Sequence, residues 1–165
     1  MMKKIFFLAV TAVLCAFGTV AAQQFPSVQI EDQEGGMVDT RTLIDGKTPV
    51  IISFWSTTCK PCIKELDAIV ENMPDWLDEA DFRVVAVSVD DSRSVARAKS
   101  LAAGRGWKSS ITLLYDKNQD FKRAMNVNTT PHVFIFDKDG KMVYTHTSYL
   151  PGSEEELIDT IISLE

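Results

Sequence analysis

The feature that most constrains this chain is a pair of cysteines placed between a strand pattern and a helix pattern. Residues 49–55 form a nearly continuous apolar run, which is typical of a strand buried on both faces. The segment Cys59-Lys60-Pro61-Cys62 follows shortly afterwards, and helical periodicity begins there. A proline is tolerated in the first turn of a helix. The order predicts a strand that delivers two thiols to a helix N-terminus, where the dipole stabilises a thiolate and the second thiol can close a disulfide.

The N-terminal residues have the pattern of a secretory signal. Lys3 and Lys4 precede an uncharged, mostly apolar run at 5–20, and small residues end at Ala22. We expect cleavage after Ala22, which divides the chain into a signal peptide (1–22) and one domain (23–165). An uncleaved membrane anchor is the alternative, although the run is shorter than the ~20 residues that span a bilayer comfortably. Cys15 lies inside the run and is interpreted as part of the removed segment.

Composition narrows the function classes. The chain of 165 residues carries 23 acidic and 17 basic residues, and loss of Lys3 and Lys4 makes the balance more acidic. This charge argues against nucleic acids and anionic membrane surfaces as partners. The two cysteines that remain after cleavage are the neighbouring pair, which closes almost no loop. Because structural disulfides act mainly by closing long loops, the spacing favours a disulfide that opens and closes.

Hydrophobic periodicity predicts alternating strands and helices with no internal repeat or linker. Strands are expected at 28–30, 37–38, 49–55, 82–89, 111–115, 132–136 and 142–149. Helices are expected from about 59, interrupted at Pro74, then at 92–103, 121–125 and, with a Ser153/Glu156 capping box, at 153–164. This order predicts an α/β fold with a mixed central sheet flanked by helices on both faces. The reactive site should lie at the carboxyl ends of the strands, where Cys59 falls.

Two distant motifs make a family resemblance specific. Residues 54–66 (FWSTTCKPCIKEL) and 129–141 (TTPHVFIFDKDGK) are similar to the TlpA/ResA-type thioredoxin-like family, and the order of elements agrees over residues 23–165. The resemblance implies a thioredoxin-like fold with an N-terminal strand extension and a strand–helix insert at about 82–104. It also implies an exported thiol–disulfide oxidoreductase that needs no bound cofactor.

The cysteines have different expected roles. Cys59, at the helix start, is the predicted nucleophile, and Cys62, on the apolar stripe, is the predicted resolving thiol of the redox-active disulfide. Lys60 adds a positive charge beside Cys59 that favours its thiolate, and Lys60 and Trp55 are candidate substrate contacts. A static disulfide or half of a zinc site is the alternative. Zinc needs about four ligands, and only two cysteines and two histidines are available outside the signal segment.

Pro131 takes its candidate role from the resemblance. In thioredoxin-like proteins a cis-proline at this place faces the disulfide, and the backbone of the preceding residue, here Thr130, pairs with an extended substrate segment. An ordinary trans proline at a strand start is the alternative, since only about 5% of X–Pro bonds are cis.

Glu65 is a candidate proton acceptor. No lysine or arginine lies three or four residues away on its helix, and it borders the buried stripe one turn beyond Cys62. A carboxylate in such a place has a raised pKa and can take the proton of the resolving thiol. The family carries a functional glutamate at this spacing. Ser53 replaces the buried aspartate of thioredoxin, which favours this role for Glu65, and a solvated surface glutamate is the alternative.

Two other functions remain open on the sequence. A peroxiredoxin-like peroxidase usually has threonine three residues before its cysteine, where this chain has Ser56. A non-catalytic periplasmic copper carrier could combine both cysteines with His132, which follows Pro131. We favour a soluble, monomeric periplasmic domain that reduces protein disulfides and receives electrons from a membrane donor, with neither metal nor cofactor. Thr58, where the family commonly has tryptophan, leaves the substrate preference open.

Overall fold

The computed structural model describes residues 25–164. The predicted signal peptide lies outside these residues. The strands are β1 (Gln29–Asp32), β2 (Met37–Asp39), β3 (Val50–Trp55), β4 (Arg83–Ser88), β5 (Thr112–Tyr115), β6 (His132–Phe136) and β7 (Met142–Thr147). The helices are α1 (Lys60–Glu79), α2 (Val95–Gly104), α3 (Asp120–Ala124) and α4 (Glu155–Ile162), with short 3₁₀ turns η1 (Thr40–Leu43) and η2 (Trp107–Ser109).

The strands form one mixed sheet in the order β2-β1-β5-β4-β3-β6-β7. The three inner strands β3, β4 and β5 are parallel, whereas β6 runs antiparallel to β3, and β1 runs antiparallel to β5. The β1–β2 hairpin, formed by the first described strands, extends the sheet beside β5, and the β6–β7 hairpin forms the opposite edge beside β3. These features confirm the predicted thioredoxin-like α/β fold and its N-terminal strand extension.

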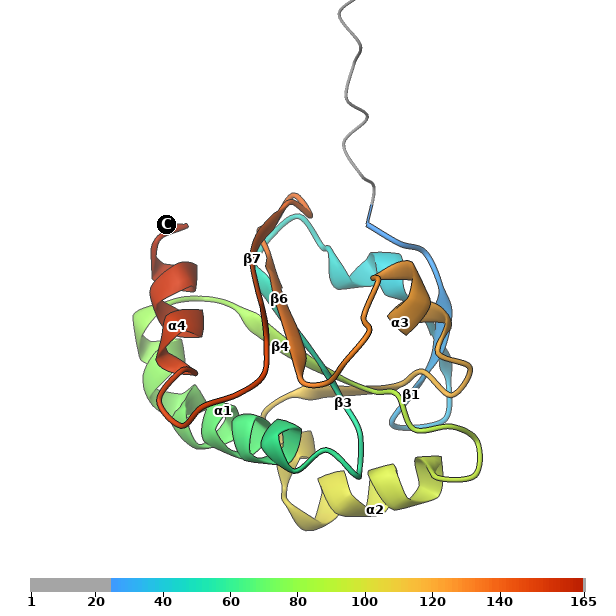
Figure 1. Cartoon of the computed structure of the whole chain (residues 1–165). Helices are drawn as coiled ribbons and strands as arrows, with labels where there is room; N and C mark the ends of the chain where they lie inside the picture. Colours follow the sequence, from blue (N-terminus) through green and yellow to red (C-terminus); the bar gives the residue numbers. More distant parts are fainter. Residues whose placement is uncertain (1–24, 165) are drawn as a thin grey trace, which may run out of the picture.

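Helices cover both faces of the sheet because the buried strands are apolar on both sides (Figure 1). In β3 every residue is buried. Ile51 and Trp55 pack in the core under α1, α2 and α4, while Ile52 and Phe54 pack in the core under η1 and α3. The period of two in a strand sends alternate side chains to opposite faces, so the continuous apolar run fills two cores at once.

The structure corrects two local predictions about the helices. Helix α1 is continuous to Glu79 and contains Pro74, and beyond it the Ala80 amide still donates to the Trp76 carbonyl. Met73 and Trp76 on either side of the proline are buried, so packing holds this turn against the sheet. The expected capping box of α4 does not form, because the Glu156 carboxylate accepts a hydrogen bond from the Tyr144 hydroxyl instead.

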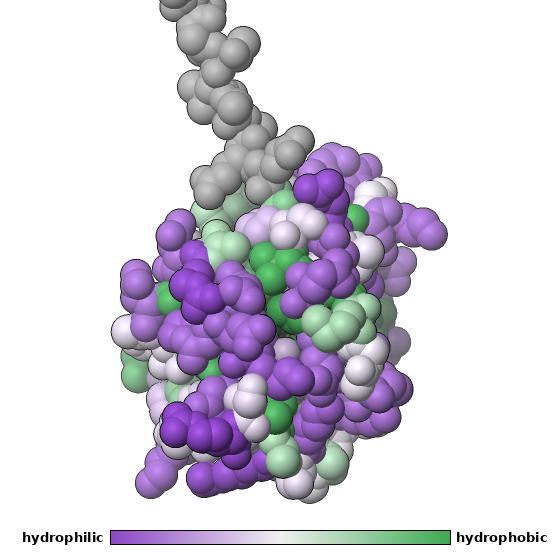
Figure 2. Space-filling view, turned by 90° about the vertical axis from the view of Figure 1, so that its right-hand side faces the viewer, coloured by the Kyte–Doolittle hydropathy of each residue, from purple (hydrophilic) through white to green (hydrophobic). Residues whose placement is uncertain are grey.

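The side of the molecule that carries η1 and α3 is mostly hydrophilic, with a hydrophobic area near its centre (Figure 2). Phe25, Ile44, Phe134 and Phe136 are among the side chains that line a hollow between η1, α3 and the β6–β7 hairpin. Within residues 25–164, none of the helices has the length and apolar character needed to cross a membrane.

Candidate active site

The cysteine pair lies where the central strand meets the longest helix. Strand β3 ends at Trp55, a short loop follows, and Cys59 is the N-cap of α1. The Cys59 sulfur accepts a hydrogen bond from the Cys62 backbone N–H at 3.2 Å, and the two sulfurs form a disulfide. A helix start has free N–H groups because they have no intrahelical acceptor, so these groups can stabilise a Cys59 thiolate when the disulfide opens.

The two sulfurs differ in their access to solvent. Cys59 is half-buried at the surface, whereas Cys62 is fully buried on the face of α1 that packs on the sheet. Only Cys59 is therefore open to an approaching partner. This asymmetry agrees with the predicted roles of an attacking and a resolving thiol.

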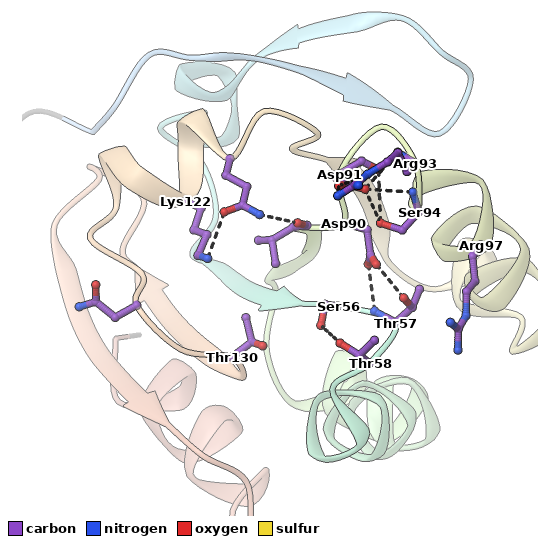
Figure 3. Close-up of a pocket in the computed structure, with 13 residues that line it drawn as sticks. Ser56, Thr57, Thr58, Asp90, Asp91, Arg93, Ser94, Arg97, Lys122 and Thr130 are labelled. Atoms are coloured by element: carbon purple, nitrogen blue, oxygen red, sulfur yellow. Dashed lines mark hydrogen bonds and ion pairs between the residues drawn. The ribbon is translucent and has the colours of Figure 1, made fainter.

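A buried aspartate holds the loop that precedes Cys59. Asp90 accepts hydrogen bonds from the Thr57 amide (2.9 Å), the Thr57 hydroxyl (2.7 Å) and the Ser88 hydroxyl (2.9 Å). Figure 3 shows the two contacts between Thr57 and Asp90. Asp90 was not predicted from the sequence, although its place directly after β4, at the carboxyl edge of the sheet, was a usable signal.

The strand register brings Pro131 to the same edge of the sheet. His132 lies opposite Phe54 in the β3–β6 pair, so Pro131 lies beside the end of β3, where the cysteine loop begins. The Thr130–Pro131 peptide bond is cis, as the resemblance implied. Thr130 is half-buried and lines a polar hollow together with Ser56 and Thr58, next to the cysteine loop (Figure 3).

Glu65 is completely buried, and its hydrogen-bond partner is His146, which lies 81 positions later in the sequence. Its Oε1 lies 2.6 Å from His146 Nε2 on β7, while Oε2 is buried without a hydrogen-bond partner. Burial raises the pKa of the Glu65 carboxyl above its usual range, and the His146 hydrogen bond and charge act in the opposite direction. The nearby charge of Glu154 raises this pKa further. The alternative of a solvated surface glutamate is therefore wrong.

His146 was not predicted as a site residue from the sequence. A usable signal was the hairpin register, because His146 lies opposite Val133, which packs in the core under α1. Side chains opposite each other in an antiparallel pair point to the same face.

Ser53 is buried in β3 and its hydroxyl has no hydrogen-bond partner. It occupies the position where thioredoxin has a buried aspartate, so this position holds no ionisable group here.

The two remaining substrate-contact candidates differ. Lys60 is exposed beside Cys59, where it can meet a partner. Trp55 is fully buried, and its ring packs edge-on against Trp107 with the centroids 5.1 Å apart. Its side chain supports the site from inside the core, so the prediction of a direct substrate contact by this ring is corrected.

His132 makes its side-chain contacts within the β6–β7 hairpin. Its Nε2 lies 3.1 Å from the Thr145 hydroxyl, and its ring stacks on Phe134. Throughout residues 25–164, no three His, Cys, Asp or Glu side chains are grouped as a metal ion would require. The donor geometry therefore gives no support to the copper hypothesis.

The profile of the Redoxin family matches residues 20–162. The chain belongs to the Redoxin family. It is 31% identical over 121 residues to the thiol-disulfide oxidoreductase ResA of Bacillus thuringiensis (strain Al Hakam), which covers 73% of this chain and 66% of that protein. The chain thus spans slightly less than two thirds of this relative. The Redoxin match and this similarity to a ResA protein confirm the predicted TlpA/ResA-type resemblance.

Solved structures of other proteins share the fold. A thioredoxin-like protein from Porphyromonas gingivalis is 47% identical, with a TM-score of 0.74 over 86% of this chain and 92% of that one. A secreted Mycobacterium tuberculosis disulfide oxidoreductase homologous to E. coli DsbE is 17% identical, with a TM-score of 0.67 over 86% of this chain and 97% of that one. The second similarity concerns the fold alone.

Proposed function

We propose that this protein catalyses thiol–disulfide exchange with protein substrates through the Cys59–Cys62 couple. The observation that carries the proposal is the asymmetry of the pair: a half-buried sulfur at a helix N-terminus is bonded to a fully buried one. The activity named for the ResA relatives supports it. The structure contains the oxidised form of the couple.

The reaction follows from this geometry. In the reduced protein the Cys59 thiolate attacks one sulfur of a substrate disulfide, and the other substrate sulfur leaves as a thiolate. Cys62 then loses its proton and attacks the Cys59 sulfur, which restores the Cys59–Cys62 disulfide and releases the second substrate thiol. Each cycle transfers two electrons to the substrate. A donor dithiol must supply two electrons to reduce the couple again.

Substrate binding is proposed at the surface around Cys59. Thr130 lies before Pro131 at the carboxyl end of β3, where its backbone can pair with an extended peptide that carries the target disulfide. Lys60 lies on the exposed side of Cys59, and Ser56 and Thr58 line the adjacent polar hollow. This lining favours a polar peptide segment over a bulky apolar one.

The cellular setting belongs to the same proposal. The signal-like residues 1–22 support export to the periplasm, and the similar Mycobacterium tuberculosis disulfide oxidoreductase is a secreted protein. We propose that the exported domain (23–165) is a monomer. In the periplasm we propose that the protein acts as a reductant and receives its electrons from a membrane dithiol donor. Cell fractionation with N-terminal sequencing tests the location and cleavage.

Three parallel assays test the activity. The purified reduced protein is mixed with insulin, with hydrogen peroxide and with Cu(I) bound to a competing chelator. We expect catalysed reduction of insulin disulfides that Cys59→Ser abolishes. Rapid peroxide turnover without insulin reduction would indicate a peroxidase, and tight Cu(I) binding without insulin reduction would indicate a copper carrier.

A further inference from the structure

A chain of hydrogen bonds runs from the buried Glu65 carboxyl to the protein surface. Glu65 Oε1 lies 2.6 Å from His146 Nε2, and His146 Nδ1 lies 3.1 Å from the Tyr144 hydroxyl. That hydroxyl donates to Glu156 Oε2 at 2.6 Å. Glu65 is completely buried, His146 and Tyr144 are half-buried on β7, and Glu156 is exposed on α4. The chain therefore joins the core to solvent through three elements.

The direction of each hydrogen bond fixes the positions of the protons. Tyr144 has one hydroxyl proton, which it donates in the hydrogen bond to Glu156. In the hydrogen bond between Tyr144 and His146, the protonated Nδ1 is therefore the donor and the Tyr144 oxygen is the acceptor. Burial and the hydrogen bond to Glu156 raise the pKa of Tyr144, which keeps this hydroxyl protonated. With Nδ1 protonated, one further proton is shared in the bond between His146 Nε2 and Glu65 Oε1.

Glu65 still has one free acceptor. Its Oε2 is buried and has no hydrogen-bond partner, and Glu65 lies one helical turn after Cys62 on the buried face of α1. An unpaired buried carboxylate oxygen is costly, and it is the atom of this group that is ready to receive a proton. The other oxygen is already linked to His146.

We propose that Glu65, His146, Tyr144 and Glu156 form a proton relay that carries the proton of the Cys62 thiol to solvent. The proposal deepens the proposed exchange function and rests on it. His146 and Tyr144 act through Glu65 and are positioning residues of the relay.

The proton transfers balance. When the Cys62 proton moves to Glu65 Oε2, the shared proton settles on His146 Nε2, and the Nδ1 proton passes to the Tyr144 oxygen. Tyr144 passes its own proton to Glu156, which releases it to water. One proton enters the chain and one leaves. The Cys62 thiolate meanwhile attacks the Cys59 sulfur, and the bond between Cys59 and the substrate sulfur breaks with its electron pair on the substrate.

Other ionisable groups surround this chain of hydrogen bonds. Glu154 raises the pKa of Glu65 from the loop before α4, and it accepts a hydrogen bond from the Tyr149 hydroxyl at 2.9 Å. His132 on β6 has its pKa lowered by burial and by the charge of His146. Tyr149 and Glu154 form a pair of the same type as Tyr144 and Glu156, but without a hydrogen bond to His146. They provide a matched control.

The test separates the two thiol steps. Each reduced protein is mixed with a stoichiometric amount of dithiobis(nitrobenzoate) in a stopped-flow instrument at a series of pH values. The first coloured thiolate reports attack by Cys59, and the second reports resolution by Cys62. Wild type, Tyr144→Phe, His146→Gln and the control Tyr149→Phe are compared.

We expect Tyr144→Phe and His146→Gln to slow the second phase about tenfold near neutral pH, without changing the first phase. Their rates should approach the wild-type rate at high pH, where hydroxide takes the thiol proton directly. Tyr149→Phe should follow wild type. Identical second-phase pH profiles for wild type and Tyr144→Phe would overturn the relay, as would equal slowing by Tyr149→Phe. A wild-type protein with no second phase would instead overturn the exchange function itself.

Discussion

Replacement of Glu65 by glutamine tests two properties of the buried carboxyl. One is its cost to the stability of the fold, and the other is its proposed role as acceptor of the Cys62 proton. A glutamine amide can still donate to His146 Nε2, so the packing and one hydrogen bond are kept while the ionisable group is lost. Because burial raises the pKa of Glu65 in the folded protein, the folded state binds this proton more tightly than the unfolded chain does.

The sign of the effect on stability follows from this shift. The contribution of Glu65 to stability is fully present below its unfolded pKa and is lost as the pH rises through its higher folded pKa. Each unit of that shift is worth about 1.4 kcal/mol. As the pH rises from acidic to neutral, the wild type should therefore lose stability relative to Glu65→Gln. The loss should be about this amount for each unit by which folding raises the pKa of Glu65.

The exchange rate should favour the wild type, although at neutral pH its relative stability is lower. Without a carboxylate to accept the Cys62 proton, exchange should slow on the order of 10- to 100-fold. Urea unfolding of the oxidised proteins over a pH series measures the stability, and insulin reduction and the pH dependence of Cys59 alkylation measure the thiol chemistry. Glu71→Gln, on an exposed position of the same helix, is the control.

Two results would contradict the proposed role of Glu65. A wild type that gains stability relative to Glu65→Gln as the pH rises would show that the buried carboxyl is not disfavoured in its charged form. Superimposable alkylation curves together with equal exchange rates would show that Glu65 takes no part in the thiol chemistry.

Two further predictions concern stability. Asp90→Ala should lower the free energy of unfolding by roughly 2–4 kcal/mol, since it leaves the buried Thr57 and Ser88 donors unpaired, and chemical denaturation measures this loss; an unchanged midpoint would show that the network does not hold the loop. Pro74→Ala should raise the stability by about 1–3 kcal/mol, because the exposed proline interrupts the hydrogen bonding of α1. A lower thermal midpoint in this variant would show that the proline fits its turn better than alanine does.

Local sequence patterns predicted most of the fold, the position of the cysteine pair and the burial of Glu65. The continuous apolar run of β3, the cysteines at the start of α1 and the turn between β6 and β7 are each determined by neighbouring residues. The burial of Glu65 could also be predicted, because it borders the apolar stripe and has no basic partner on its helix.

Contacts between distant segments could not be predicted in the same way. His146 is 81 positions from Glu65 along the chain. The hairpin register places it on the face of the sheet under α1, but no sequence pattern pairs it with Glu65. Trp55 looked like a residue of the site because of its place in the motif, but Trp107 covers its ring. At Pro74, burial of the flanking side chains outweighed the local preference for a break.

Cys59 is proposed to attack the substrate disulfide and Cys62 to resolve the mixed disulfide. The direct measurement is trapping of a mixed disulfide between each single-cysteine variant and a disulfide-containing protein, followed by mass spectrometry of the linked peptides. Cys62→Ser should accumulate a mixed disulfide on Cys59, and Cys59→Ser should trap almost none, because Cys62 is fully buried. Equal trapping by both variants, or linkage through Cys62 alone, would contradict this account of the site.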